Sequence, residues 1–154
     1  MAKWRRSLYH PNLPLGENGK RVTACAEHTE LSKNTAKEGM VLLKNNDSVL
    51  PFGKGTKLAL FGMGTFDYVK GGGGSGDVTV EYTVNLYDGL KKLHNQVEVC
   101  EEAADFYRAY IQEISDTHYW PGQKPEPELP EELCKRARAF TDTAVISISR
   151  LSGE

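Results

Sequence analysis

The feature of this sequence that most constrains its fold is a short, nearly continuous apolar run at residues 57–62, Lys-Leu-Ala-Leu-Phe-Gly. The run shows no alternation of apolar and polar residues, which is typical of a strand that is buried on both faces. Strands of this kind occur in parallel sheets with helices packed on both sides. We therefore expect an α/β fold in which residues 57–62 form the first strand of the sheet.

The rest of the chain alternates between helical and strand patterns. Apolar residues recur at helical spacing in four segments, residues 24–44, 83–93, 101–115 and 130–141. Thr23 or Thr29 could cap the first of these helices. Two further segments are predicted strands, residues 96–100 and 143–149, whereas residues 78–82 are too short to assign. Strands that alternate with helices predict a three-layer α/β sandwich with a mostly parallel sheet.

The end of the sequence is unusual for such a sheet, because only residues 150–154 follow the last predicted strand. A buried parallel strand normally continues through a loop into a crossover helix. We therefore expect the sheet to be incomplete in this chain. We expect residues 1–22 to form an irregular N-terminal arm and residues 23–154 to form the sandwich. Within it, residues 116–130 carry four prolines among acidic residues and predict an exposed insertion.

Composition excludes several classes of protein. Lys plus Arg number 19 and Asp plus Glu 21, for a net charge of −2, and no basic stripe indicates nucleic-acid binding. Cys25, Cys100 and Cys134 form no CxxC pair, which argues against a zinc site or a disulfide framework and favours a reduced, cytoplasmic protein. The basic start at residues 1–6 precedes no apolar run, so neither a signal peptide nor a membrane span is predicted. We expect no metal and no cofactor.

Residues 70–77, Lys-Gly-Gly-Gly-Gly-Ser-Gly-Asp, hold five glycines in six positions. Such a run occurs where the backbone takes positive φ or approaches a ligand or neighbouring domain closely, or in a flexible linker. A flexible linker is not expected between two structured segments of one domain. Nucleotide motifs also fit poorly: Gly62 and Gly64 supply two glycines of a dinucleotide fingerprint, but Asp67 stands at the third, and no Gly-Lys-Ser or Gly-Lys-Thr ends the run.

The order of several motifs resembles the family 3 glycoside hydrolases, a group of β-glucosidases and related exo-acting enzymes. The resemblance covers most of the chain. The matching segments are residues 36–45, 50–51, 57–62, 70–77, 82–90 and 146–154. The first three are similar to the helix, turn and strand that open the family's second, α/β sandwich domain. The last is similar to the strand and loop that deliver the general acid/base glutamate in β-glucosidases of this family.

The resemblance implies a retaining, exo-acting hydrolysis of β-linked glucosides or oligosaccharides with two carboxylates. It assigns Glu154 as the general acid/base, a role that requires a raised pKa. It also implies a substrate-binding surface made by the glycine-rich run and an arginine beside Glu154. The residues of this surface are Lys70, Gly71, Gly72, Gly73, Gly74, Ser75, Gly76, Asp77 and Arg150. We expect the run to shape a sugar pocket or a domain junction by close backbone approach, without binding phosphate.

The nucleophilic aspartate of this family belongs to a (β/α)8 barrel domain, and no such barrel fits into 154 residues. We therefore expect this chain to be inactive alone and to need the barrel domain of the same protein as its partner. Met1 and the irregular arm are typical of a parent protein in which the sandwich precedes the barrel, although a cloned fragment would begin in the same way. A homo-oligomer is compatible with the sequence.

A second hypothesis, from a different class, is a non-catalytic α/β module that binds a carbohydrate or a partner protein through residues 70–77 and 116–130. Without the family resemblance, Glu154 is best interpreted as a solvated glutamate at the end of the chain. The position of Ser152, Gly153 and Glu154 directly after a predicted buried strand, taken with the resemblance, favours the catalytic assignment.

Overall fold

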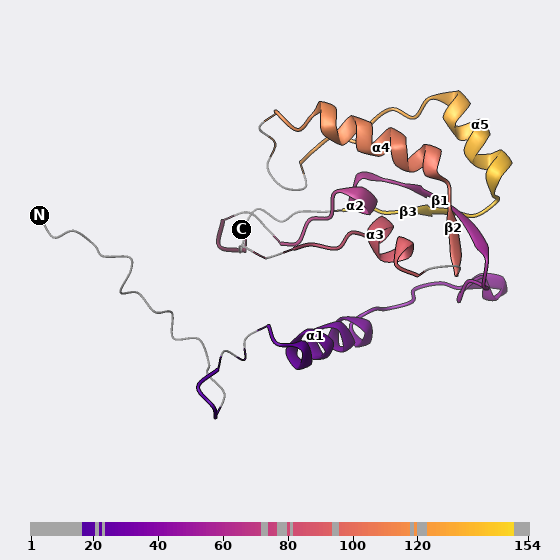
Figure 1. Cartoon of the computed structure of the whole chain (residues 1–154). Coiled ribbons are helices and arrows are strands. Elements are labelled where there is room, and N and C mark those ends of the chain that lie inside the picture. The colour runs from indigo at the N-terminus through magenta and orange to yellow at the C-terminus, as the bar shows by residue number, and fades with distance from the viewer. Residues whose placement is uncertain are drawn as a thin grey trace, which may run out of the picture. The chain divides into compact units, whose positions relative to one another are not determined.

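The computed structural model describes residues 17–20, 22, 24–71, 74–76, 80, 82–93, 96–117, 119 and 123–149. The chain divides into two compact units at the Leu50–Pro51 bond, Met1–Leu50 and Pro51–Glu154. Among the residues that the structure describes, no helix is both long enough and apolar enough to cross a bilayer. Figure 1 shows the helices and strands of the two units.

The first unit contains helix α1 (Ala26–Glu38) and the short 3-10 helix η2 (Asn46–Ser48). Cys25 is the N-cap of α1, whereas Thr29 lies inside the helix and Thr23 lies outside the described residues. The prediction of a helix up to residue 44 is wrong, because α1 ends at Glu38 and Gly39 is its C-cap. Glycine is about 1 kcal/mol less favourable than alanine inside a helix. The amide of Gly39 closes the last turn on Thr35 O at 3.0 Å.

A turn follows α1 and is closed by one side chain. The amide group of Asn45 donates from Nδ2 to Leu50 O at 2.8 Å and accepts at Oδ1 from Leu50 N at 2.9 Å. Asp47 and Ser48, between them, have φ of 56° and 54°, in the left-handed region. Asparagine and aspartate tolerate such turns because their short polar side chains bond to nearby backbone.

The second unit is built on a parallel sheet of three strands, β1 (Thr56–Phe61), β2 (Val97–Val99) and β3 (Ala144–Ile146), in the order β2-β1-β3. β1 is central: Thr56 pairs with Val97 on one side, and Ala59 pairs with Ala144 on the other. Both pairings are parallel, which confirms the predicted sheet type. β2 and β3 begin and end within the predicted segments but are shorter than predicted.

Four α-helices accompany the sheet, α2 (Met63–Phe66), α3 (Leu86–Lys91), α4 (Glu101–Glu113) and α5 (Glu131–Phe140). The last three confirm the predicted helices with shorter bounds, whereas α2 and the 3-10 helix η3 (Gly74–Gly76) were not predicted. The tentative segment at residues 78–82 lies mostly outside the described residues. Figure 1 shows α4 and α5 along one side of the sheet and α3 along the other.

The side chains of β1 alternate between these two helical layers, as the pleat of a strand requires. Leu58 and Leu60 pack in one cluster with Tyr87 of α3 and with α2, and Tyr107 in the middle of α4 joins it. Ala59 packs in a second cluster with Ala103 of α4 and Ala137 of α5. Leu58, Ala59 and Leu60 are at most 3% exposed, so both faces of the strand are buried as predicted. The result is a three-layer α/β sandwich.

Candidate functional site

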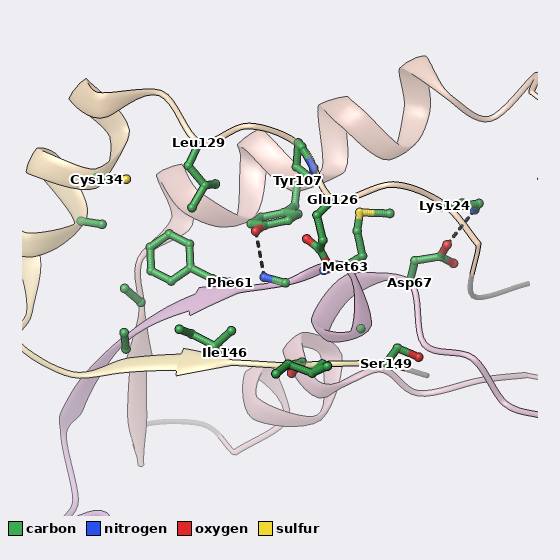
Figure 2. Close-up of a pocket in the computed structure, with 18 of the residues that line it drawn as sticks. Phe61, Met63, Asp67, Tyr107, Lys124, Glu126, Leu129, Cys134, Ile146 and Ser149 are labelled. Atoms are coloured by element: carbon green, nitrogen blue, oxygen red, sulfur yellow. Dashed lines mark hydrogen bonds and ion pairs between the residues drawn. The ribbon is translucent and has the colours of Figure 1, made fainter. Parts of the chain in front are cut away.

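A cavity of about 810 Å³ in the second unit runs between α5 and the strands β1 and β3 and reaches the carboxyl ends of both strands. Ligands of open α/β sheets bind beyond the carboxyl ends of the strands, and ligand pockets commonly measure about 300–1,000 Å³. Figure 2 shows apolar side chains from both strands and from the loop before α5 around this space, namely Phe61, Ile146 and Leu129. Polar side chains of the lining include Asp67, Lys124 and Glu126.

The turn from β1 into α2 forms part of the cavity wall and is shaped by Gly62. This residue has φ of +91°, and its amide donates to the hydroxyl of Tyr107 at 2.8 Å. A Cβ atom added to Gly62 would lie 2.2 Å from the carbonyl oxygen of Ser147, on the segment after β3. Ser147 in turn donates its amide to Phe61 O at 3.0 Å. The residues that directly follow β1 and β3 therefore lie against each other, and there is no room for a side chain at position 62.

The predicted proline-rich insertion contacts α2 and the turn before it through two described side chains, Lys124 and Glu126, and a third hydrogen bond joins its backbone to α4. Lys124 Nζ lies 2.7 Å from Asp67 Oδ2, an ion pair that Figure 2 shows beside the turn. Glu126 Oε1 accepts from the amide of Met63 at 2.8 Å, at the start of α2. Tyr110 on α4 donates its hydroxyl to Pro125 O at 3.1 Å. These contacts hold residues 124–126 against α2 and α4.

Tyr107 lies in α4, within the segment that the spacing of apolar residues predicts to be helical, and that spacing gives no role to its hydroxyl. The ring is 2% exposed and stacks on Phe66, with ring centroids 5.0 Å apart. Burial raises the pKa of Tyr107, and the hydrogen bond from Gly62 opposes that rise in pKa. The phenol is therefore neutral at physiological pH, and its oxygen accepts from the backbone of the turn.

Replacing Tyr107 by Phe should lower the free energy of unfolding by about 1–2 kcal/mol, because the buried amide of Gly62 would lose its acceptor. Urea unfolding of the 154-residue chain measures this loss. Tyr110→Phe is the matched control, since the Tyr110 hydroxyl bonds to Pro125 O at an exposed position. We expect the control to lose less than half as much. Equal losses would contradict a special role for the bond at Gly62.

The structure describes about half of the predicted site residues. Lys70, Gly71, Gly74, Ser75 and Gly76 are described, and the last three form η3. A Cβ atom at Gly71 would lie 2.5 Å from Gly76 O, so this loop folds back tightly on its own backbone. That close approach accounts for glycine at position 71.

The remaining predicted site residues, Gly72, Gly73, Asp77, Arg150 and Glu154, lie outside the described residues. The residues that directly precede the two predicted site segments are nevertheless described. Val69, before Lys70, and Ser149, before Arg150, both line the cavity. Within the described part of the chain, no three histidine, cysteine, aspartate or glutamate side chains come together as ligands for a metal ion.

Comparison with known proteins gives several matches. A family model described as "Glycosyl hydrolase family 3 C-terminal domain" matches residues 40–154. Beta-glucosidase A of Butyrivibrio fibrisolvens is 55% identical over 154 residues, which are 100% of this chain and 19% of that protein. A beta-glucosidase of Ruminococcus albus is 34% identical over 134 residues, which are 83% of this chain and 14% of that protein.

Solved structures agree with these matches. The structure of beta-glucosidase 3B from Thermotoga neapolitana in complex with glucose is similar with a TM-score of 0.73 and 35% identity, over 83% of this chain and 18% of that chain. A beta-glucosidase from Paenibacillus barengoltzii gives a TM-score of 0.73 and 32% identity, over 84% of this chain and 15% of that chain. The chain thus spans less than a fifth of the length of each of these four relatives. The family match over residues 40–154 and the 55% identical relative show that this chain belongs to glycosyl hydrolase family 3.

Proposed function

We propose that this chain is part of a retaining, exo-acting β-glycosidase of the β-glucosidase type, and that it supplies Glu154 and the loop at residues 70–77 to the active site. One observation carries the proposal: in a member of this family, the cavity at the carboxyl ends of β1 and β3 is lined by Val69 and Ser149, which lead directly into these two segments. The names of the relatives, all β-glucosidases, support β-glucosides as the substrate class.

In the proposed reaction, Glu154 is first a general acid. It gives its proton to the glycosidic oxygen as the bond from that oxygen to the anomeric carbon breaks, while a second carboxylate attacks the carbon and forms a covalent glycosyl intermediate. Glu154, now ionised, then takes a proton from water as the water oxygen attacks the anomeric carbon and the second carboxylate leaves. The carboxyl pair of such enzymes is about 5 Å apart.

Other residues of the chain would tune this chemistry. A general acid at neutral pH needs a pKa well above that of an ordinary glutamate, which a desolvated pocket or a nearby carboxylate can provide. The apolar side chains of Phe61, Leu129 and Ile146 supply a surface of low polarity at the cavity. Arg150, four residues before Glu154, is a candidate to hold a carboxylate in place. The backbone amides of residues 70–77 could donate to sugar hydroxyls, because glycine lets the main chain come close.

The second carboxylate is proposed to come from a (β/α)8 barrel domain elsewhere in the same protein. The isolated 154-residue chain should therefore show no hydrolysis of an aryl β-glucoside above the uncatalysed rate, whereas the full-length protein should turn it over. A chromogenic assay at equal protein concentrations compares the two, with circular dichroism to show that the chain is folded. Robust hydrolysis by the isolated chain would contradict the need for a second domain.

A further inference from the structure

We propose that Thr65 is a positioning residue for the segment that carries Glu154, acting through the hydroxyl of Ser147; this inference depends on the function proposed above. Thr65 is completely buried, although its side chain is polar. Its Oγ1 lies 2.9 Å from Phe61 O and 2.8 Å from Ser147 Oγ. A threonine hydroxyl has one proton but two acceptor lone pairs. Thr65 can therefore donate its hydroxyl to Phe61 O and accept a hydrogen bond from the hydroxyl of Ser147 at the same time.

This arrangement connects the β1–α2 region with a residue 82 positions later in the sequence. Phe61 ends β1, Thr65 lies in α2, and Ser147 is the first residue after β3. Burying a polar side chain costs free energy unless the side chain is hydrogen-bonded. The Thr65 hydroxyl therefore strongly favours the arrangement in which it is bonded to both Phe61 O and the Ser147 hydroxyl. The bond thus fixes the rotamer of Ser147 and the direction of the chain as it leaves the sheet.

Backbone packing reinforces the same contact. A Cβ atom at Gly64 would lie 3.4 Å from the Cβ of Ser149 and 3.5 Å from the Cβ of Ser147. The segment at residues 147–149 therefore runs directly along the β1–α2 turn. On its other side, β3 pairs with no further strand among the described residues, and Ile146 and Ile148 are 67% and 73% exposed. Phe61, Gly64 and Thr65 therefore all contact this exit segment.

The consequence for catalysis follows from distance along the chain. Arg150 follows Ser149 directly, and Glu154 lies five residues beyond Ser149. A catalytic group displaced by about 1 Å can lose on the order of 10²-fold in rate. Loss of one hydrogen bond in the supporting structure should displace the exit segment by less. We expect a fall in kcat of about tenfold with little change in KM, because the general acid acts mainly in the transition state.

The test uses the full-length protein with two variants, Ser147→Ala and Thr65→Val, each of which removes the bond from one side. Ser147→Ala is the gentler change, because Thr65 still donates to Phe61 O. Both variants should lower kcat about tenfold for an aryl β-glucoside with a poor leaving group, and much less for one with a good leaving group that needs no protonation. The double variant should lose no more than the larger single loss. Thr65→Ser, which keeps the hydroxyl, should restore most of the rate.

Thr56→Val is the matched control. Thr56 lies at the opposite end of β1, and its hydroxyl donates to Gly53 O at 2.7 Å. Thr56→Val also removes a threonine hydroxyl that donates to a backbone oxygen, although at a more exposed position, so it should not alter the dependence of the rate on the leaving group. Equal losses for both leaving groups in Ser147→Ala and Thr65→Val, or no loss in either, would overturn the positioning role. If Glu154→Gln itself shows no dependence on the leaving group, the proposed function fails as well, and the two failures are distinguished.

Discussion

Full-length protein that carries Glu154→Gln should lose about 10²–10⁴-fold in kcat/KM toward an aryl β-glucoside with a poor leaving group. Glutamine keeps the size of the side chain but has no proton to give to the departing oxygen. A strongly acidic phenol can leave the anomeric carbon without protonation. For a substrate with such a leaving group, the rate at which the glycosyl intermediate forms should change little. The basic limb of the pH profile of kcat/KM, which reports ionisation of the general acid, should also disappear.

Glu113→Gln is a suitable control for this experiment, since Glu113 is an exposed residue at the end of α4. Its kinetics should match those of the wild type for both substrates. Wild-type turnover of the poor substrate by Glu154→Gln would refute the acid/base assignment and favour the hypothesis of a non-catalytic binding module. Steady-state rates over a series of leaving groups give the most direct measurement, because the slope against leaving-group pKa should steepen when the proton donor is lost.

Gly62→Ala should lower the free energy of unfolding by about 2–5 kcal/mol, the largest stability effect expected at the site. Two causes add. A residue with a Cβ atom is strained at φ of +91°, and the new methyl group would lie 2.2 Å from Ser147 O. Backbone on both sides is fixed, because Gly62 donates to Tyr107 and Ser147 donates to Phe61. Neither segment can move without breaking one of these bonds.

Gly55→Ala separates the two causes. Gly55 has a similar φ of +80°, but nothing lies within 4 Å of an added Cβ atom. This variant should therefore lose only the conformational part, about 1–2 kcal/mol. Urea unfolding of the two variants of the 154-residue chain measures the difference between them. If Gly62→Ala loses no more than Gly55→Ala, the close approach of the two strand exits is not a constraint on this fold.

The sheet could be predicted because the residues of β1 alone indicate that this strand is buried. An apolar run without alternation requires burial on both faces, and Leu58, Ala59 and Leu60 are buried on both. The length of β3 could not be predicted in this way. The predicted strand continues to residue 149, but its partner β1 ends at Phe61, where Gly62 turns the chain away. The end of β3 is thus set by a residue more than eighty positions earlier in the sequence.

The extent of α1 shows a different limit. Apolar residues at 40–43 fit a helical continuation, yet the helix ends at Glu38, and Met40, Val41, Leu42 and Leu43 are 61–92% exposed. A buried apolar face normally decides whether such a segment is helical. Without that burial, the cost of Gly39 inside a helix is enough to end α1.

The contacts at the candidate site could not be predicted from local sequence patterns. Lys124 and Asp67 are 57 residues apart, Glu126 and Met63 are 63 apart, and Thr65 and Ser147 are 82 apart. No periodicity links such pairs, and a proline-rich insertion predicts exposure without indicating which of its side chains bind the turn. The assignment of Glu154 and of residues 70–77 depends on the family resemblance, and both assignments stay predictions. Gly62 was considered as part of a weak nucleotide fingerprint, whereas its described contact is with Ser147.

The central place of β1 has a consequence for how the chain is made. Of the three described strands, β1 is synthesised before β2 and β3, which are its two partners, and β3 is synthesised after β2. Until β3 is synthesised, the edge of β1 that it will cover has unpaired backbone groups. Parallel sheets with distant partners form slowly and leave such edges open to association with other chains. During translation, this edge of β1 should therefore be open to association with other chains in the interval between the synthesis of β1 and that of β3.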